Sequence, residues 1–233
     1  MKPVALIILM ISGLYLGCIE KEKTDIMEEK TYTYLALGDS YTIGEGVEES
    51  GRYPNQAVEI LKSKGLIFEK PTIIAKTGWT TDELDQGIEA AGIQGKTYDL
   101  VTLLIGVNNQ YRVRPVSDYE TEFRKMLTKT IRFAKGNPKH VVVISIPDWG
   151  VTPFATDRGT DREKVAKEID AYNIAKERIS KELGVYYIDI TEEYRKVGAL
   201  PEMVVEDKLH PSELVYKSWA EKLANVILTD MTF

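Results

Sequence analysis

The sequence predicts a three-layer α/β/α sandwich, in which a five-stranded parallel sheet is covered by helices on both faces. Short apolar runs alternate with longer segments of helical period along the chain, and this alternation is typical of parallel strands joined by helical crossovers. The run at 100–105 is almost entirely apolar, as expected of a strand buried on both faces. The 233 residues, 43% of them hydrophobic, suffice for one sizeable core but not for two full domains.

Each element follows from periodicity and from the signals that begin and end helices. The expected strands cover residues 32–37, 71–75, 100–105, 141–146 and 185–190. The expected helices cover residues 55–64, 81–91, 117–135, 161–183 and 212–228. Thr81 is the expected N-cap of the second helix, because Asp82 and Glu83 then lie in the first turn, where the helix dipole favours acids. Gly184 ends the fourth helix.

The first 30 residues differ in character from the rest. Lys2 precedes an apolar stretch at 4–16 that ends in small residues and Cys18, the single cysteine of the chain. This arrangement predicts a signal peptide over residues 1–17, with an uncleaved N-terminal anchor as the alternative. The segment Tyr15-Leu16-Gly17-Cys18 resembles a bacterial lipoprotein box, except that leucine is usual at the position of Tyr15. The resemblance implies that Cys18 carries a lipid.

These features predict an exported protein that is held at a cell-envelope membrane by the lipid on Cys18. Residues 18–30 are too charged and too poor in aromatic residues to pack, so they are expected to form a lipidated tether, and residues 31–233 the folded domain. The chain has 30 basic and 36 acidic residues without a basic run, which argues against a nucleic-acid partner. Two separated histidines and one cysteine provide no cluster of metal ligands, and we expect no cofactor. The oligomeric state is left open.

A candidate catalytic triad emerges from the two histidines. Ser40 follows the first strand, at the carboxyl edge of the sheet, where reacting groups gather in open parallel sheets. A serine nucleophile needs a base. His140 begins the fourth strand at the opposite edge and is expected to be structural, whereas His210 lies in the loop before the last helix. Asp207 is three residues before His210, close enough to orient the imidazole, although a D-x-x-H pair is weak evidence when it stands alone.

Over residues 31–233 the chain resembles the SGNH, or GDSL, family of serine esterases and lipases. The blocks that carry this resemblance are, in order, Gly38-Asp39-Ser40, Gly78, Gly106-Val107-Asn108-Asn109 and the pair Asp207 and His210. The resemblance implies a flavodoxin-like SGNH hydrolase fold. It also implies an oxyanion hole formed by the backbone N–H groups of Ser40 and Gly78 and by the side-chain amide of Asn108. Tyr41 is the fourth residue of the first block and is assigned no catalytic part, and Asn109 replaces an aspartate that supports the site.

The resemblance implies hydrolysis of carboxylic esters, either small acyl esters or lysophospholipid-like substrates, through an acyl-enzyme on Ser40. Two alternatives remain open: an O-acyltransferase or deacetylase that acts on envelope carbohydrate, and a catalytically idle binding lipoprotein. The aromatic loop after the fourth strand is expected near the site, where Trp149 either contacts substrate or anchors the loop. Tyr111 is a second candidate substrate contact, and Arg112 is expected to be solvated at the surface.

Overall fold

Five parallel strands form the main sheet of the protein. The computed structural model describes residues 30–233, so the predicted signal peptide, the predicted lipidation at Cys18 and the predicted tether up to residue 29 lie outside the described residues. The sheet has the order β4-β2-β5-β6-β7, which in chain order is the 2-1-3-4-5 arrangement of flavodoxin-like folds. Its strands are β2 (Tyr34–Asp39), β4 (Thr72–Lys76), β5 (Leu100–Leu104), β6 (Val141–Ile144) and β7 (Tyr186–Ile188). The predicted fold class is therefore confirmed.

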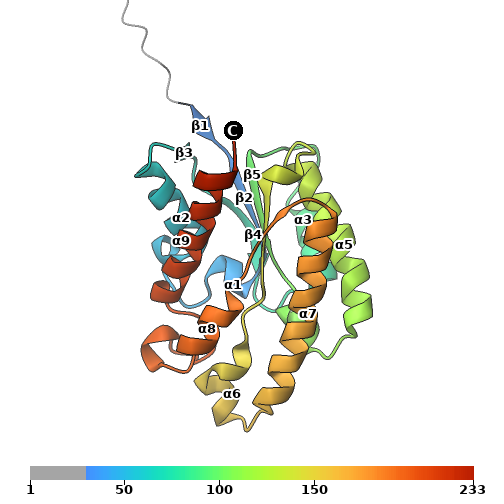
Figure 1. The fold of residues 1–233 in the computed structure, drawn as a ribbon, viewed down its shortest axis with the longest axis vertical. Helices are drawn as coiled ribbons and strands as arrows, with labels where there is room; N and C mark the ends of the chain where they lie inside the picture. Colours follow the sequence, from blue (N-terminus) through green and yellow to red (C-terminus); the bar gives the residue numbers. More distant parts are fainter. Residues whose placement is uncertain (1–29) are drawn as a thin grey trace, which may run out of the picture.

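Helices cover both faces of this sheet. Helices α2 and α9 pack against each other on one face, and α3, α5 and α7 cover the other (Figure 1). The helices are α1 (Ser40–Ile43), α2 (Tyr53–Lys62), α3 (Thr81–Ala90), α4 (Val107–Tyr111), α5 (Val116–Phe133), α6 (Pro153–Asp157), α7 (Arg162–Glu182), α8 (Thr191–Val197) and α9 (Glu213–Asp230). Within residues 30–233, none of the helices has both the length and the apolar composition that crossing a bilayer requires.

Each expected strand and helix is present, with its ends displaced by no more than two residues. The elements that the sequence did not predict are short: α1, α4, α6 and α8, together with β1 (Thr31–Tyr32) and β3 (Ile67–Phe68), which pair with each other in parallel. Segments of two to seven residues are too short to display a period. One predicted cap is wrong. The N-cap of α3 is Thr80, which forms a capping box with Glu83 and whose backbone N–H donates to Glu83 Oε2 over 2.9 Å. Thr81 is the first residue of the helix, and its hydroxyl donates to Asn109 Oδ1 over 3.1 Å.

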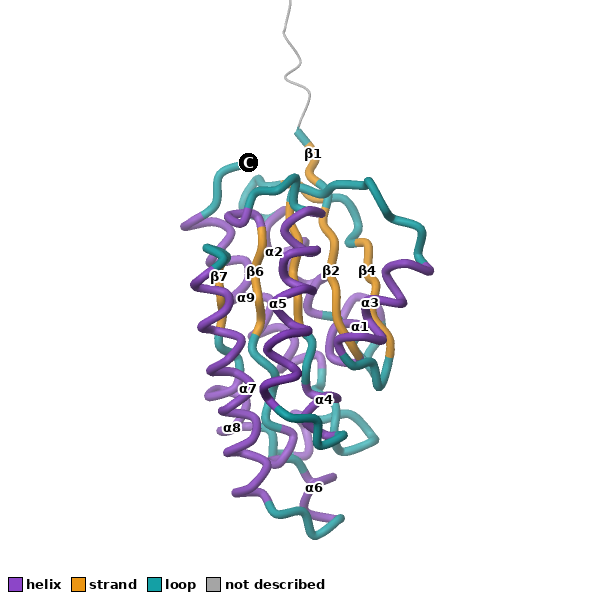
Figure 2. Tube along the Cα trace, turned by 90° about the vertical axis from the view of Figure 1, so that its right-hand side faces the viewer, coloured by secondary structure: helices purple, strands orange, loops and turns teal. Residues whose placement is uncertain are grey.

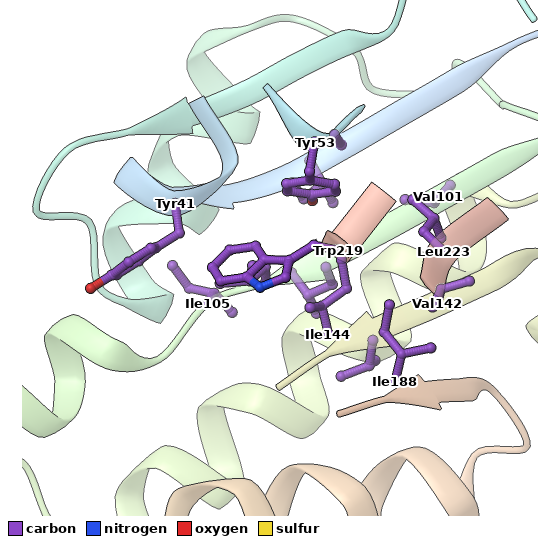
Figure 3. Packing of buried hydrophobic residues seen from close by; sticks show 14 of the residues in the cluster. Tyr41, Tyr53, Val101, Ile105, Val142, Ile144, Ile188, Trp219 and Leu223 are labelled. Atoms are coloured by element: carbon purple, nitrogen blue, oxygen red, sulfur yellow. The ribbon is translucent and has the colours of Figure 1, made fainter. Parts of the chain in front are cut away.

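The core forms on both faces of the sheet, because every residue of β2 and β5 is buried. Figure 3 shows Trp219 of α9 among Tyr41, Tyr53 and Ile144, so that the last helix fills the space between α1, α2 and β6. Trp219 is only 1% exposed. Burial of a large aromatic side chain contributes about 1.5–3 kcal/mol of hydrophobic free energy. This packing fixes α1, and with it the start of the candidate site.

Different groups lie at the amino and carboxyl ends of the parallel strands. The first described strand and the C-terminus lie at the amino edge, and α4 and α6 lie beyond the carboxyl ends of the strands (Figures 1 and 2). His140 is at the amino edge, where its Nε2 lies 3.0 Å from the carbonyl oxygen of Thr232 and its ring packs 5.0 Å from the ring of Phe233. This position agrees with the structural part expected for His140. The carboxyl edge is left to Ser40 and the loops around it.

Candidate active site

Ser40 is placed by a direct transition from β2 into α1. Asp39 is both the last residue of β2 and the N-cap of α1, and its Oδ1 accepts a first-turn backbone N–H over 3.1 Å. Gly38 has no room for a side chain, since a Cβ atom there would lie 2.1 Å from Thr42 Oγ1 and 2.3 Å from the carbonyl oxygen of Leu104. The glycine therefore allows the helix to begin close against the strand ends. As a result, Ser40 lies at the carboxyl edge of the sheet.

The structure brings the three predicted triad side chains into one hydrogen-bonded chain. His210 Nε2 lies 2.9 Å from Ser40 Oγ, and His210 Nδ1 lies 2.6 Å from Asp207 Oδ2. Ser40 is 4% exposed and His210 is 7% exposed, so most bulk water is kept from the hydrogen bond between them. Both distances are within the normal hydrogen-bond range. The imidazole is therefore in place to accept the proton of the Ser40 hydroxyl.

Asp207 is held as the acid partner by its own turn. Its Oδ1 accepts the backbone N–H of Leu209 over 2.8 Å and that of His210 over 2.9 Å, while Oδ2 is left for the imidazole. Burial raises the pKa of the Asp207 carboxyl, but the hydrogen bonds from the His210 ring and from these two backbone groups outweigh burial, so its pKa lies below its ordinary value. An ionised carboxylate at this position keeps the imidazole proton on Nδ1 and leaves Nε2 free to act as a base.

Tyr41 supports the imidazole from the side. Its ring lies 5.3 Å from the ring of His210 and 6.3 Å from that of Trp219, and it is 2% exposed. We expected no catalytic part for this residue, and its contact with His210 is between the two rings. The structure shows that it packs against the imidazole of His210. A sequence alone could not reveal this contact, because it joins residues on distant segments of the chain.

The two other predicted oxyanion donors lie on neighbouring loops. Gly78 follows β4 with a φ of 84°, a left-handed conformation that glycine adopts readily. Asn108 is in the first turn of α4, and its Nδ2 donates to the carbonyl oxygen of Trp79 over 3.0 Å. A primary amide carries two hydrogens, so this bond orients the Asn108 side chain and leaves the second hydrogen for a ligand. Ser40, Gly78 and Asn108 line the same cavity.

Arg112 links the loops that carry these two donors. Its Nη2 donates to the carbonyl oxygen of Gly78 over 2.6 Å, and its Nη1 donates to Glu83 Oε1 over 2.9 Å. The Arg112 side chain is 43% exposed, so it lies at the surface as expected, but its guanidinium group also binds two protein oxygens. A charge-assisted bond of this kind fixes the Gly78 peptide relative to the end of α4.

Asn109 also joins neighbouring elements, although it replaces the usual aspartate. It is fully buried at 0% exposure, and its Oδ1 accepts the backbone N–H of Thr81 over 3.1 Å. Its Nδ2 donates to Glu122 Oε2 over 3.1 Å. The amide therefore connects the N-terminus of α3, the start of α4 and helix α5. This role fits the supporting part that the sequence analysis expected at this position.

A cavity of about 190 Å³ opens beside Ser40 and the oxyanion donors. No Lys, Arg, Asp or Glu side chain of residues 30–233 lines it, and its apolar wall includes Trp149, Tyr111, Phe154 and Leu209. Trp149 is 7% exposed and donates from Nε1 to Gln110 Oε1 over 2.8 Å, so it is both an anchor of its loop and part of the wall. The Tyr111 ring lies 5.2 Å from that of Trp149 in an edge-on arrangement and is 49% exposed. The structure thus places both candidate contact residues at the cavity.

The arrangement combines a serine hydroxyl, an imidazole, a carboxylate and polar N–H donors around one small apolar cavity. These are the groups that acyl transfer through a covalent intermediate requires. Among residues 30–233, no group of three or more His, Cys, Asp or Glu side chains is arranged to hold a metal ion.

Solved structures share this architecture at low sequence identity. The psychrotrophic esterase EstA from Pseudoalteromonas sp., in a structure inhibited by monoethylphosphonate, has a TM-score of 0.63 and 14% identity, over 84% of this chain and 97% of EstA. The lipase/acylhydrolase from Enterococcus faecalis has a TM-score of 0.64 and 18% identity, over 84% of this chain and 95% of that one. The acetylxylan esterase Axe2 from Geobacillus stearothermophilus has a TM-score of 0.63 and 19% identity, over 86% and 95%.

Comparisons of the sequence alone give two different results. None of the curated protein sequences matches this chain. The sequence model of the GDSL-like Lipase/Acylhydrolase family, however, matches residues 36–217, a span that contains Ser40, Gly78, Asn108, Asp207 and His210. This confirms the resemblance that the sequence blocks indicated. The chain therefore belongs to the GDSL-like lipase/acylhydrolase family.

Proposed function

We propose that the protein is a serine hydrolase that cleaves carboxylic esters through an acyl-enzyme on Ser40. The observation that carries this proposal is the continuous chain from Ser40 Oγ through His210 to Asp207, with links of 2.9 Å and 2.6 Å, at the edge of an apolar cavity. Membership of the lipase/acylhydrolase family supports ester hydrolysis as the reaction.

The reaction follows from the positions of these groups. Ser40 Oγ attacks the ester carbonyl carbon while His210 Nε2 takes the hydroxyl proton, and the carbonyl oxygen becomes an oxyanion. The N–H groups of Ser40 and Gly78 and the amide of Asn108 stabilise this oxyanion. His210 then gives its proton to the leaving alcohol, and Ser40 retains the acyl group. Water, deprotonated by His210, attacks the acyl-enzyme, and the carboxylic acid leaves as Ser40 recovers its proton.

The size and chemistry of the cavity support a small, uncharged acyl group. A volume of about 190 Å³ is below the usual range for sites that enclose a drug-sized ligand, which begins at about 300 Å³. Among the described residues, no lysine or arginine lines it to pair with a carboxylate on the acyl group. An acyl group that ends in a carboxylate would therefore lose its hydration without gaining a partner.

A series of p-nitrophenyl esters tests this substrate class. We expect kcat/KM to be highest for acetate to butyrate and to fall at least about 10-fold by decanoate, because a chain longer than the cavity collides with its wall and displaces the ester carbonyl from Ser40. Hydrolysis of the same series by Ser40→Ala gives the background rate. A maximum at decanoate or beyond would show that the acyl group binds elsewhere, and no hydrolysis of any ester would contradict the proposed reaction.

Deacetylation of an envelope carbohydrate is the second candidate. The small cavity favours an acetyl group, and Axe2, which has the same fold, is an acetylxylan esterase. Release of acetate from an acetylated oligosaccharide, at a rate above that with p-nitrophenyl acetate, would favour this reading. Transfer of the acetyl group to a sugar in place of water would instead identify an O-acyltransferase that uses the same acyl-enzyme.

We further propose that the protein is exported and held at a membrane by a lipid on Cys18. The support is the order of Lys2, the apolar stretch at 4–16 and the single cysteine. We expect metabolic labelling of the full chain with palmitate, and loss of both the label and the membrane association in Cys18→Ser. Membrane association that persists in Cys18→Ser without any label would identify an uncleaved anchor instead.

A further inference from the structure

Lys176 of α7 is a fully buried lysine that the proposed reaction does not use. Its side chain is 0% exposed, and the ring of Phe123 lies 5.6 Å from its Nζ. An ammonium group is costly in a protein interior unless hydrogen bonds and opposite charge compensate for the lost water. Burial lowers the pKa of Lys176 to about 7. The groups that surround Nζ therefore indicate what this residue does.

Two strand ends meet at the ammonium group. Nζ donates to the carbonyl oxygen of Ile144 over 2.6 Å and to that of Ile105 over 3.2 Å. Ile144 is the last residue of β6, and Ile105 directly follows β5, so both carbonyls lie at the carboxyl edge of the sheet. Lys176 thus ties together two neighbouring strands at the edge that carries the active site.

The Ile105 carbonyl is held a second time, by Tyr119 of α5. The Tyr119 hydroxyl donates to this oxygen over 3.0 Å, and Tyr119 is 0% exposed. The next residue, Gly106, has a φ of 127°, and a Cβ atom on it would lie 2.6 Å from the Tyr119 hydroxyl oxygen. The backbone of Ile105 and Gly106 is therefore fixed by its carbonyl and by the tyrosine packed against it. Asn108 follows two residues later in the same turn.

The ammonium group also acts on the strand that carries the nucleophile. Asp39 is 0% exposed, and its Oδ2 has no hydrogen-bond partner among the described residues. Burial raises the pKa of the Asp39 carboxyl to about 7, while the backbone N–H of Tyr41 and the charge of Lys176 favour the carboxylate. Lys176 is therefore electrostatically coupled to the cap of α1, the helix that begins at Ser40.

We propose that Lys176 is a positioning residue for the oxyanion hole. It fixes the Ile105 carbonyl, together with Tyr119, so that the turn after β5 aims the Asn108 amide at the oxyanion beside Ser40. Lys176 does not line the cavity beside Ser40, and in this proposal its effect on the reaction passes through Asn108 rather than through Asp39. The proposal rests on the acyl-transfer reaction at Ser40 proposed above.

The variant Lys176→Met tests this role, because methionine has a similar length and removes the ammonium group. We expect kcat to fall about 10- to 100-fold, since a catalytic group displaced by about 1 Å can cost 100-fold in rate. KM should change less than about 2-fold, because the lost interaction is made only in the transition state. Tyr119→Phe removes the hydroxyl that donates to the same carbonyl oxygen. We expect this variant also to lower kcat, by about 3-fold or more.

A matched control is available on the same helix. Ser180 lies one turn after Lys176, is 0% exposed, and its Oγ has no partner among the described residues. Ser180→Ala therefore changes a buried polar group of α7 without touching a strand end, and its kcat should remain within about 2-fold of the wild-type value. Circular dichroism and thermal unfolding of each variant separate a loss of fold from a loss of position.

A double-mutant cycle identifies the path through Asn108. Asn108→Ala alone should lower kcat about 100-fold or more. If Lys176 acts by aiming Asn108, Lys176→Met should cost less than about 3-fold in kcat when Asn108 is already absent. Full multiplication of the two losses, or an unchanged kcat in folded Lys176→Met, would overturn the proposal. If Lys176→Met does not fold, an unchanged kcat in Tyr119→Phe would overturn it. A wild-type protein without esterase activity would contradict the proposed function instead.

Discussion

Replacement of Ser40 by alanine is expected to lower kcat for ester hydrolysis about 10⁵-fold. The variant lacks the oxygen that forms the acyl-enzyme, so only the oxyanion donors and substrate binding remain, and these account for a small residual rate. The measurement is kcat with p-nitrophenyl acetate, corrected for spontaneous hydrolysis. Ser40 is 4% exposed and alanine fits its place, so thermal unfolding should change little.

The exposed serine at position 50 provides the control for Ser40→Ala. Ser50 lies in the turn Glu49–Gly51 and does not line the cavity, so Ser50→Ala should retain wild-type kcat. If Ser40→Ala keeps more than about 1% of wild-type activity, Ser40 is not the nucleophile and the catalytic assignment is wrong.

The second large effect is expected from Asp207→Asn, which should lower kcat about 10⁴-fold while the fold is retained. The asparagine amide donates a hydrogen bond to His210 Nδ1, where the carboxylate accepts one. The imidazole proton is then held on Nε2, which can no longer accept the proton of Ser40 Oγ, 2.9 Å away. The measurement is kcat at pH 7 to 8. An Asp207→Asn variant with near wild-type activity would show that the carboxylate does not set the tautomer.

The same variant changes the pH dependence of stability. The pKa of Asp207 is lowered in the folded protein, because hydrogen bonds outweigh burial, so folding favours the ionised form. Its stabilising contribution is complete above the unfolded pKa of about 3.9 and is lost as pH falls through the lower folded value. We therefore expect the gap in unfolding free energy between wild type and Asp207→Asn, measured in urea, to narrow as pH falls from 6 to 2.5. A constant gap would contradict the lowered pKa.

The main elements of the fold could be predicted because each one carries a complete local signal. The segment Leu100–Leu104 is buried at every residue and stands in the sequence as an almost continuous run of apolar residues. Helices α5 and α7 are long enough to display the helical period of their apolar residues. The four-residue α1 carries no such period. It exists because Asp39 caps it and Gly38 leaves room for it against Thr42, and these contacts depend on the folded strand.

The triad could be predicted because the topology of the sheet determines where its loops go. Once five parallel strands are expected, Ser40 must emerge at the carboxyl edge, and His140 is excluded by its place at the start of a strand. The side chains around the triad could not be predicted in this way. The packing of Tyr41 on His210 and the bond from Arg112 to Gly78 join distant loops, and neither leaves a local pattern in the sequence.

The sequence of α7 does carry a local signal for the burial of Lys176. The buried residues of α7 include Val165, Ile169, Tyr172 and Ile179, whose spacings of four, three and seven residues define the apolar stripe of a helix. Lys176 occupies the stripe position between Tyr172 and Ile179. A lysine at this position must either reach solvent or find buried acceptors, and only the folded sheet shows that the acceptors are the ends of β5 and β6.

Covalent trapping tests the central claim, that His210 activates Ser40 as the nucleophile, most directly. The wild-type protein is treated with a fluorophosphonate, digested and analysed by tandem mass spectrometry. We expect one adduct per chain, on Ser40, none in Ser40→Ala and a labelling rate at least about 100-fold lower in His210→Ala. An adduct on another residue, equal labelling of His210→Ala, or no adduct in a protein that hydrolyses esters would contradict it. If neither an adduct nor esterase activity is found, the assignment of Ser40 as a nucleophile is wrong and a catalytically idle binding protein becomes the favoured hypothesis.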